Sequence, residues 1–260
     1  MASAWTTTVS AVVLSLAACG GSDAATTTTS VEHATLDGEV LVSAAASLTD
    51  AFTEVASAFE VANPDLDVVL NLGPSSGLRE QIIEGAPADV FASANTSNMD
   101  QVVQAGEVVA TPEIFARNLL QIAVPSGNPA GVTGLEDFAR DDLLIGLCAE
   151  EVPCGDFARQ ALAKAEVTLS IDSNEPDVRA LLTKIEAGEL DAGITYVTDV
   201  ASAGGSVDGV DIPEDRNVIA EYPIAALTHA PNPDAAAAFV AFVLSDEGRA
   251  ILGGYGFASP

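Results

Sequence analysis

Basic residues are scarce in this chain. Its 260 residues include 9 Lys and Arg against 38 Asp and Glu, a formal net charge of −29, and the first basic residue is Arg79. Nucleic acids and anionic membrane surfaces attract basic proteins, so this composition argues against both as partners. The acidic residues form no single tail. We interpret their excess as favouring solubility rather than as forming a cation site.

Signals of catalysis are equally scarce. The chain has two His, His33 and His229, and neither has a recognisable nucleophile as a partner. No P-loop motif for nucleotide phosphates is present. The Cys residues lack the His or second Cys pair that would indicate a zinc site. We therefore predict a binding protein without a cofactor, and keep a secreted enzyme or an interaction lipoprotein as the less favoured alternative.

The N-terminal apolar run is short. Residues 11–18 are too few to span a bilayer, and the run ends in Leu16-Ala17-Ala18-Cys19. This ending resembles the lipobox of bacterial lipoproteins, in which the Cys becomes the acylated first residue after cleavage. The resemblance implies a signal peptide at residues 1–19 and lipidation of Cys19, although the usual basic region is missing. The polar residues that follow, 20–38, predict a flexible linker.

From Glu39 onward, strand-like and helix-like segments alternate. The predicted strands are 40–43, 67–72, 89–93, 119–124, 143–147, 192–197 and 222–227, and the predicted helices are 48–62, 78–84, 98–105, 157–165, 178–187 and 235–244. Such alternation predicts an α/β fold with mostly parallel sheets flanked by helices. Turn-rich breaks near 125–134 and 204–217 bracket a middle block. We expect lobe one at 39–120 and 221–260, with lobe two inserted at 121–220.

Four turns in this pattern open helices with small or polar residues. They are the turn at Ser47 and those at residues 73–79, 152–156 and 175–179. In α/β folds ligands bind where strands end and helices begin, because free amides there attract anions. Capping and ordinary helix punctuation would explain each turn separately: Ser47, for instance, would serve as an N-cap. Four such turns in one chain favour an anion site.

Longer stretches resemble periplasmic molybdate-binding proteins of ABC transporters. The resemblance includes Ala44-Ala45-Ala46-Ser47-Leu48-Thr49-Asp50, Ser75-Ser76-Gly77-Leu78-Arg79, residues 85–94, Val152-Pro153-Cys154-Gly155, Asp177-Val178-Arg179, residues 193–199, Tyr222-Pro223-Ile224 and Gly254-Tyr255-Gly256-Phe257. It extends in order from residue 39 to residue 258. It implies a two-lobed type II periplasmic-binding fold, with the ligand in the cleft between the lobes.

The resemblance also implies a set of site residues. Ser47 and Ser75 would provide hydroxyl and amide donors, Cys154 and Val178 backbone amides, and Tyr196 its phenol; Ser76 is the alternative to Ser75. Pro74 departs from the family, which often has a residue with an N–H there. Molybdenum would be held only within the oxyanion, with no direct protein ligand.

The implied function is capture of molybdate, and of tungstate, for import. The partners would be an ABC-transporter permease and its ATPase, and the membrane only through the lipid anchor. We expect an exported monomer, held at the outer face of the cytoplasmic membrane or in the periplasm. A carrier of another tetrahedral oxyanion (sulfate, phosphate or thiosulfate) is the alternative function, because the sequence does not determine the size of the cavity.

Two Cys remain once Cys19 is assigned to the lipid. Cys148 and Cys154 are six residues apart and flank the third turn. In an exported protein such an even pair predicts a disulfide. The alternative is two buried free thiols that pack as small apolar side chains.

Overall fold

The structure is a computed structural model that describes residues 36–260. The predicted signal peptide, Cys19 and nearly all of the predicted linker lie outside the described residues. The helices are η1 (Ala46–Leu48), α1 (Thr49–Ala62), α2 (Ser75–Ile83), α3 (Thr96–Gln104), η2 (Leu135–Ala139), α4 (Pro153–Lys164), α5 (Val178–Glu186), α6 (Val197–Ser202), α7 (Pro233–Leu244) and α8 (Asp246–Gly254). The strands are β1 (Gly38–Ala45), β2 (Leu66–Gly73), β3 (Val90–Ala92), β4 (Glu113–Pro125), β5 (Ile145–Cys148), β6 (Ser173–Glu175), β7 (Ala192–Tyr196), β8 (Val207–Asp211) and β9 (Ile219–Ala226).

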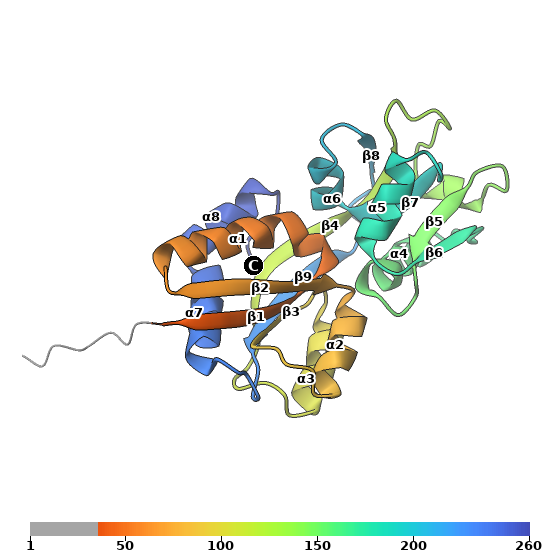
Figure 1. The fold of residues 1–260 in the computed structure, drawn as a ribbon. Helices are drawn as coiled ribbons and strands as arrows, with labels where there is room; N and C mark the ends of the chain where they lie inside the picture. Colours follow the sequence, from red (N-terminus) through yellow and green to blue (C-terminus); the bar gives the residue numbers. More distant parts are fainter. Residues whose placement is uncertain (1–35) are drawn as a thin grey trace, which may run out of the picture. The chain divides into compact units, whose positions relative to one another are not determined.

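The strand order is β2-β1-β3-β9-β4-β7-β5-β6, with β8 also paired to β4 (Figure 1). The predicted α/β fold, a sheet flanked by helices, is confirmed. The pairing is less parallel than predicted. The pairs β1–β2, β1–β3, β5–β6 and β5–β7 are parallel, whereas β3–β9, β4–β7, β4–β8 and β4–β9 are antiparallel. The antiparallel pairs all involve β4 or β9, and a periodic apolar pattern does not specify the direction of a strand's neighbour.

Strand β4 belongs to both halves of the sheet. Its first part, from Glu113 to Leu119, pairs with β9, and its second part, from Leu120 to Pro125, pairs with β7 and β8. The predicted lobe boundaries at 120/121 and 220/221 fall within β4 and β9, and these boundaries stay a prediction.

Helices cover both faces of the first half of the sheet. Along β3, Val90 and Ala92 lie in the core that includes α1 and α7, whereas Phe91 packs with Leu78 of α2 and Met99 of α3. Successive side chains of a strand point to opposite faces, so these two sets of helices lie on opposite sides of the sheet. This arrangement leaves the strand ends free to form a site. Within residues 36–260, no helix combines the length and the apolar character needed to cross a membrane.

A bulge accommodates Pro223 in the interior of the sheet. Pro223 of β9 pairs with Ile114 of β4, and the register then shifts so that Ala116 pairs with Tyr222. The extra residue, Phe115, packs its ring against that of Tyr222 at a centroid distance of 6.2 Å. Because proline has no N–H to donate to a neighbouring strand, it is found at such irregularities. The bulge thus sets the position of Tyr222.

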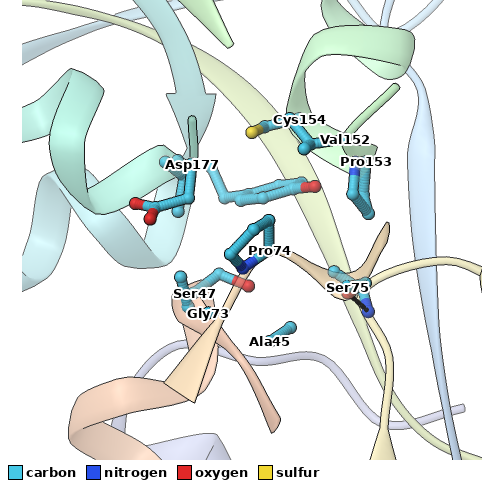
Figure 2. A pocket seen from close by; sticks show the side chains of 13 residues that line it. Ala45, Ser47, Gly73, Pro74, Ser75, Val152, Pro153, Cys154 and Asp177 are labelled. Carbon is cyan, nitrogen blue, oxygen red and sulfur yellow. Dashed lines mark hydrogen bonds between the residues drawn. The ribbon is translucent and has the colours of Figure 1, made fainter. Parts of the chain in front are cut away.

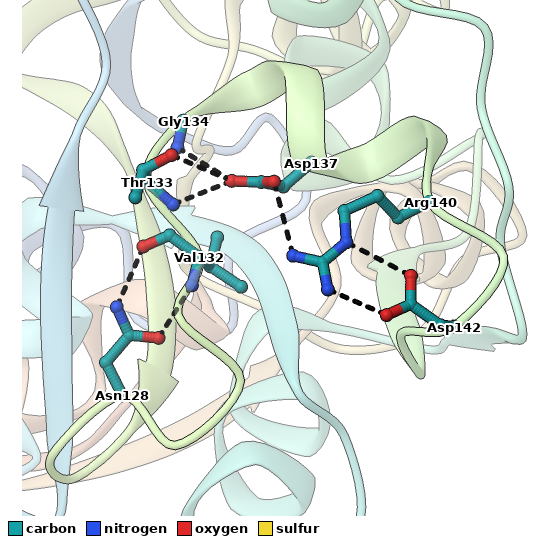
Figure 3. A network of polar contacts seen from close by, with 7 residues as sticks. All are labelled: Asn128, Val132, Thr133, Gly134, Asp137, Arg140 and Asp142. Atoms are coloured by element: carbon teal, nitrogen blue, oxygen red, sulfur yellow. Dashed lines mark hydrogen bonds and ion pairs between the residues drawn. The ribbon is translucent and has the colours of Figure 1, made fainter.

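The loop between β4 and β5 is held by its own side chains (Figure 3). Asn128 accepts from the N–H of Val132 at 2.9 Å and donates to the carbonyl of the same residue at 2.8 Å. The carboxylate of Asp137 accepts from the N–H of Thr133 at 2.7 Å, which lowers the pKa of Asp137, and it also contacts Arg140. The first of the two predicted turn-rich breaks is therefore an ordered loop.

Candidate functional site

The four turns singled out in the sequence meet at one cavity (Figure 2). The space between them is about 230 Å³, including its open mouth. Its lining residues are Ala45, Ala46, Ser47, Gly73, Pro74, Ser75, Ala94, Val152, Pro153, Cys154, Asp177, Val178 and Tyr196. All five predicted site residues are in this set, and all are buried. Ser75 lines the cavity, whereas the alternative, Ser76, does not.

The helices that begin at the cavity mostly lack side-chain caps. The starts of η1, α2 and α4 have no side-chain cap hydrogen bond. In contrast, α7 and α8 begin away from the cavity and are capped by Asn232 and Ser245. The first amides of an uncapped helix have no partner within the helix, and its dipole places partial positive charge there. The cavity therefore gathers free backbone donors, the arrangement that binds anions.

Ser47 does not act as an N-cap. It lies within the short helix η1, whose N-cap residue is Ala45. The Ser47 Oγ is 3.0 Å from the Tyr222 Oη, and no hydrogen bond joins this hydroxyl to a backbone amide of the described residues. The capping explanation is therefore wrong for Ser47, and its hydroxyl is left for another role.

Ser75 begins α2 directly after β2. Its Oγ accepts a hydrogen bond from the N–H of Ala94 at 3.0 Å. A hydroxyl that accepts still has one proton to donate. The contact with Ala94 holds the side chain at the cavity while leaving that proton free for a ligand. Ala94 was not predicted to have a role, although it lies within the resembling stretch 85–94.

The opposite wall provides two backbone amides. Pro153 is the first residue of α4, and Val178 is the first of α5. The N–H groups of Cys154 and Val178 donate to no other described residue. At α5, Asp177 accepts from the N–H groups of Arg179 and Ala180 at 2.8 and 2.9 Å, so its cap spares the amide of Val178.

Tyr196 ends β7 with its phenol at the cavity. It is 1% exposed, and its Oη is buried without a hydrogen-bond partner among the described residues. Burial, aided by the neighbouring Tyr222 and Asp199, raises the pKa of Tyr196 well above its ordinary value. The phenol is therefore a neutral donor at any physiological pH. An unsatisfied buried hydroxyl is costly, which suits a group that a ligand satisfies.

Asp199 lies beneath Tyr196. Its carboxylate accepts from the N–H of Tyr196 at 3.1 Å and is 1% exposed. Burial raises the pKa of Asp199 to about 7; the hydrogen bond and Arg179 oppose this shift, whereas Asp50 and Asp177 add to it. Asp199 does not line the cavity, and its contact with the site is the hydrogen bond to the Tyr196 backbone.

The lining carries no positive side chain. Of the residues around the cavity, Asp177 is the one with a charge, and Figure 2 shows its carboxylate turned away from Pro153 and Ser75. The spacing Gly73-Pro74-Ser75-Ser76-Gly77 also fits the nucleophile turn of hydrolases. No His lines the cavity to activate Ser75, however, and its hydroxyl is engaged by an amide. Within residues 36–260, no group of three His, Cys, Asp or Glu side chains could hold a metal ion.

The predicted disulfide is present. Cys148 at the end of β5 is bonded to Cys154 in the first turn of α4. The next residue, Gly155, lies so close to the strand end that a Cβ there would meet the carbonyl oxygens of Ala149 at 1.9 Å and Cys148 at 2.5 Å. Only glycine allows this approach. The bond and the glycine together hold the start of α4 against β5, where Cys154 lines the cavity.

Comparison with known proteins agrees with this geometry. The model of the bacterial extracellular solute-binding protein family matches residues 40–258. The molybdate-binding protein ModA of Mycobacterium tuberculosis H37Rv is 37% identical over 249 residues, which cover 96% of this chain and 95% of that protein.

Solved structures show the same fold. The periplasmic molybdate-binding protein of Azotobacter vinelandii has a TM-score of 0.74 at 18% identity, over 85% of this chain and 99% of that one. The sulfate-binding protein SubI of Mycobacterium tuberculosis has a TM-score of 0.77, also at 18% identity, over 85% and 86% of the two chains.

Proposed function

Since the chain belongs to the family of bacterial extracellular solute-binding proteins, we propose that it captures molybdate, and also tungstate, for import by an ABC transporter. The dianion is held in the cavity between η1, α2, α4 and α5. Ser47 and Ser75 donate through their hydroxyls, Cys154 and Val178 through their backbone N–H groups, and Tyr196 through its phenol.

One observation carries this proposal: the cavity gathers buried, neutral donors, three of which (Cys154 N–H, Val178 N–H and Tyr196 Oη) have no partner among the described residues, and no basic side chain lines it. Hydrogen bonds to a charged group contribute about 1.5–3 kcal/mol each, before the cost of ordering. Several together are enough to hold a dianion away from water. Local dipoles form the site, so a net charge of −29 is compatible with an anionic ligand.

Molybdate is favoured over sulfate by the comparison with relatives. The 37% identical relative is named as a molybdate-binding protein, and the match covers 96% of this chain. The sulfate-binding neighbour is 18% identical, and this likeness supports the shared fold alone. Sulfate therefore stays the second candidate ligand.

The proposal also includes where the protein is located and which proteins receive its ligand. A signal peptide and lipidation at Cys19 would export the chain and anchor it at the outer face of the cytoplasmic membrane. A permease and its ATPase would receive the ligand from a monomeric carrier that has no cofactor. The resemblance to a lipobox and the family support these points.

Calorimetric titration of the purified protein with molybdate, tungstate, sulfate and phosphate tests the ligand. We expect tight binding of molybdate and tungstate, and binding of sulfate weaker by at least about a hundredfold, or about 2.7 kcal/mol. The larger tetrahedral anion reaches donors on both walls, whereas a smaller one leaves donors unpaired. Sulfate affinity equal to that for molybdate would refute the molybdate assignment.

A further inference from the structure

A buried tyrosine outside the cavity contacts one of the proposed donors. Tyr222 of β9 is fully buried and is not part of the cavity lining. Its Oη lies 3.0 Å from the Oγ of Ser47. Three aromatic rings surround its own ring, those of Phe115, Tyr196 and Phe257, at centroid distances of 6.2, 6.1 and 5.4 Å. The phenol therefore has a fixed position behind Ser47.

The direction of this hydrogen bond follows from the surroundings. Ser47 Oγ is the one atom of the described residues that meets hydrogen-bond geometry with Tyr222 Oη, although the side chains of Asn118 and Tyr196 lie close enough to affect the pKa of the phenol. If Ser47 donated its proton, the phenol proton of Tyr222 would be left with Asn118 or Tyr196 in poorer geometry, which costs free energy. If Tyr222 donates, the phenol is satisfied and Ser47 keeps a proton to donate elsewhere. Burial raises the pKa of Tyr222, so the phenol keeps the proton that it donates.

We infer that Tyr222 is a positioning residue: its phenol donates to Ser47 Oγ and so directs the Ser47 proton into the cavity, toward the anion. This inference rests on the proposed function, because it concerns how Ser47 serves that ligand. Without Tyr222, the Ser47 hydroxyl would rotate freely, and part of its population would point away from the anion. Fixing one rotamer before the ligand arrives lowers the ordering cost of binding.

The first test is Tyr222→Phe, measured by calorimetric titration with molybdate. Phenylalanine keeps the ring packing and removes only the hydroxyl. We expect affinity to fall about tenfold, the scale of one well-placed hydrogen bond. Tyr255→Phe is the matched control, because Tyr255 donates to Glu54 at 2.8 Å on the exposed surface. Its affinity should equal that of the wild type.

The second test separates positioning from a general structural effect. In a Ser47→Ala background there is no hydroxyl to direct, so adding Tyr222→Phe should change molybdate affinity by less than about twofold. An equal loss in both backgrounds, or no loss in the single variant, would overturn the inference. Failure of the wild-type protein to bind molybdate would instead refute the proposed function, so the two failures are distinguishable.

Discussion

Two buried tyrosines differ in whether their hydroxyls are satisfied. The Oη of Tyr196 has no partner among the described residues, whereas that of Tyr222 is paired with Ser47. A buried unsatisfied hydroxyl costs about 1–3 kcal/mol, and removing a paired one loses about 1 kcal/mol. The ligand-free protein thus gives up stability at Tyr196 to keep a donor available.

We therefore expect Tyr196→Phe to have opposite effects on folding and on binding. Without ligand, the free energy of unfolding should rise by about 1 kcal/mol, since an unsatisfied buried group is gone. Molybdate affinity should fall about tenfold, since a donor is lost. Urea unfolding and calorimetric titration measure the two effects, with Tyr222→Phe as a comparison that should lower both. A less stable Tyr196→Phe protein would show that its hydroxyl is already paired.

Asp199 should make stability depend on pH. Its pKa is about 7 in the folded protein against an ordinary 3.8, so between these values the folded state binds more protons than the unfolded state. The free energy of unfolding should therefore fall as pH rises through this window, by up to about 1.4 kcal/mol per pH unit, and then level off. Below about pH 4, where Asp199 is protonated in both the folded and the unfolded state, the free energy of unfolding keeps its full value with respect to this group.

Urea unfolding of the wild type and of Asp199→Asn at several pH values tests this sign. Asparagine still accepts from the N–H of Tyr196 but does not titrate. The free energy of unfolding of the wild type minus that of the variant should fall from about pH 4 to about pH 7 and stay constant above. A difference that does not change with pH would show that Asp199 is ionised throughout.

At the scale of elements, the disulfide holds a helix start in place. Cys148 and Cys154 join the end of β5 to the first turn of α4. Closing so short a loop stabilises by about 2 kcal/mol in the chain-entropy model. It also fixes the amide of Cys154, which lines the cavity.

Reduction should therefore lower both the melting temperature and the molybdate affinity. A Cys148→Ala, Cys154→Ala double variant should match the reduced wild type in both measurements. Cys154→Ala alone, under reducing conditions, should keep the affinity of the reduced protein, because only its backbone is proposed to bind. Full affinity in the double variant would show that the turn keeps its shape without the bond.

Six of the helices were predicted with starts within four residues of those observed, whereas α6 and α8 were not predicted. The spacing of Leu48, Phe52 and Val55 predicted the first helix, and these residues are buried in α1 and the turn before it. Strands β6 and β8 were not predicted, because their residues are few and mostly polar. The antiparallel pairing of β4 and β9 was not predicted either, since apolar runs encode burial and not the direction of a neighbour.

The candidate site was predicted in part. The resemblance named the five residues that meet at the cavity, which no local pattern would have joined across more than 100 residues of chain. Tyr222 was missed as a functional residue. A tyrosine in an apolar strand is indistinguishable from a core residue until the group facing its hydroxyl is known. The small residue Ala94 gave no sequence signal of its own.

At the scale of the whole molecule, two electrostatic effects act on the ligand. The net charge of −29 repels an approaching dianion over distances set by salt. Next to the lining residue Val178, Arg179 of α5 forms an ion pair with Asp50 of α1 and also donates to Ser202 of α6 at 3.0 Å. The pair joins the first turn of α1, which follows Ser47, to the first turn of α5, which begins at Val178. It therefore resists separation of the two cavity walls.

The net charge should affect the association rate of molybdate, whereas the ion pair should affect its dissociation rate. Raising ionic strength from about 0.01 M to about 0.15 M shortens the screening length from ~30 Å to ~8 Å, so the association rate of molybdate should rise. Asp50→Asn should raise the dissociation rate by about 1.5-fold to fivefold, the range for a partly exposed ion pair of about 0.2–1 kcal/mol. Asp100→Asn, an exposed position on α3, makes the same change in net charge away from the cavity.

Stopped-flow measurement of both variants distinguishes the two causes. Both variants should increase the association rate, and Asp50→Asn should do so more strongly, because its charge lies closer to the cavity and its loss leaves Arg179 unpaired. Only Asp50→Asn should release molybdate faster than the wild type. The difference in dissociation rate between this variant and the wild type should become smaller at high salt, where the wild-type ion pair is itself screened. Equal release rates in the two variants would mean that the Asp50–Arg179 pair does not hold the walls together, and that net charge alone governs how salt affects binding.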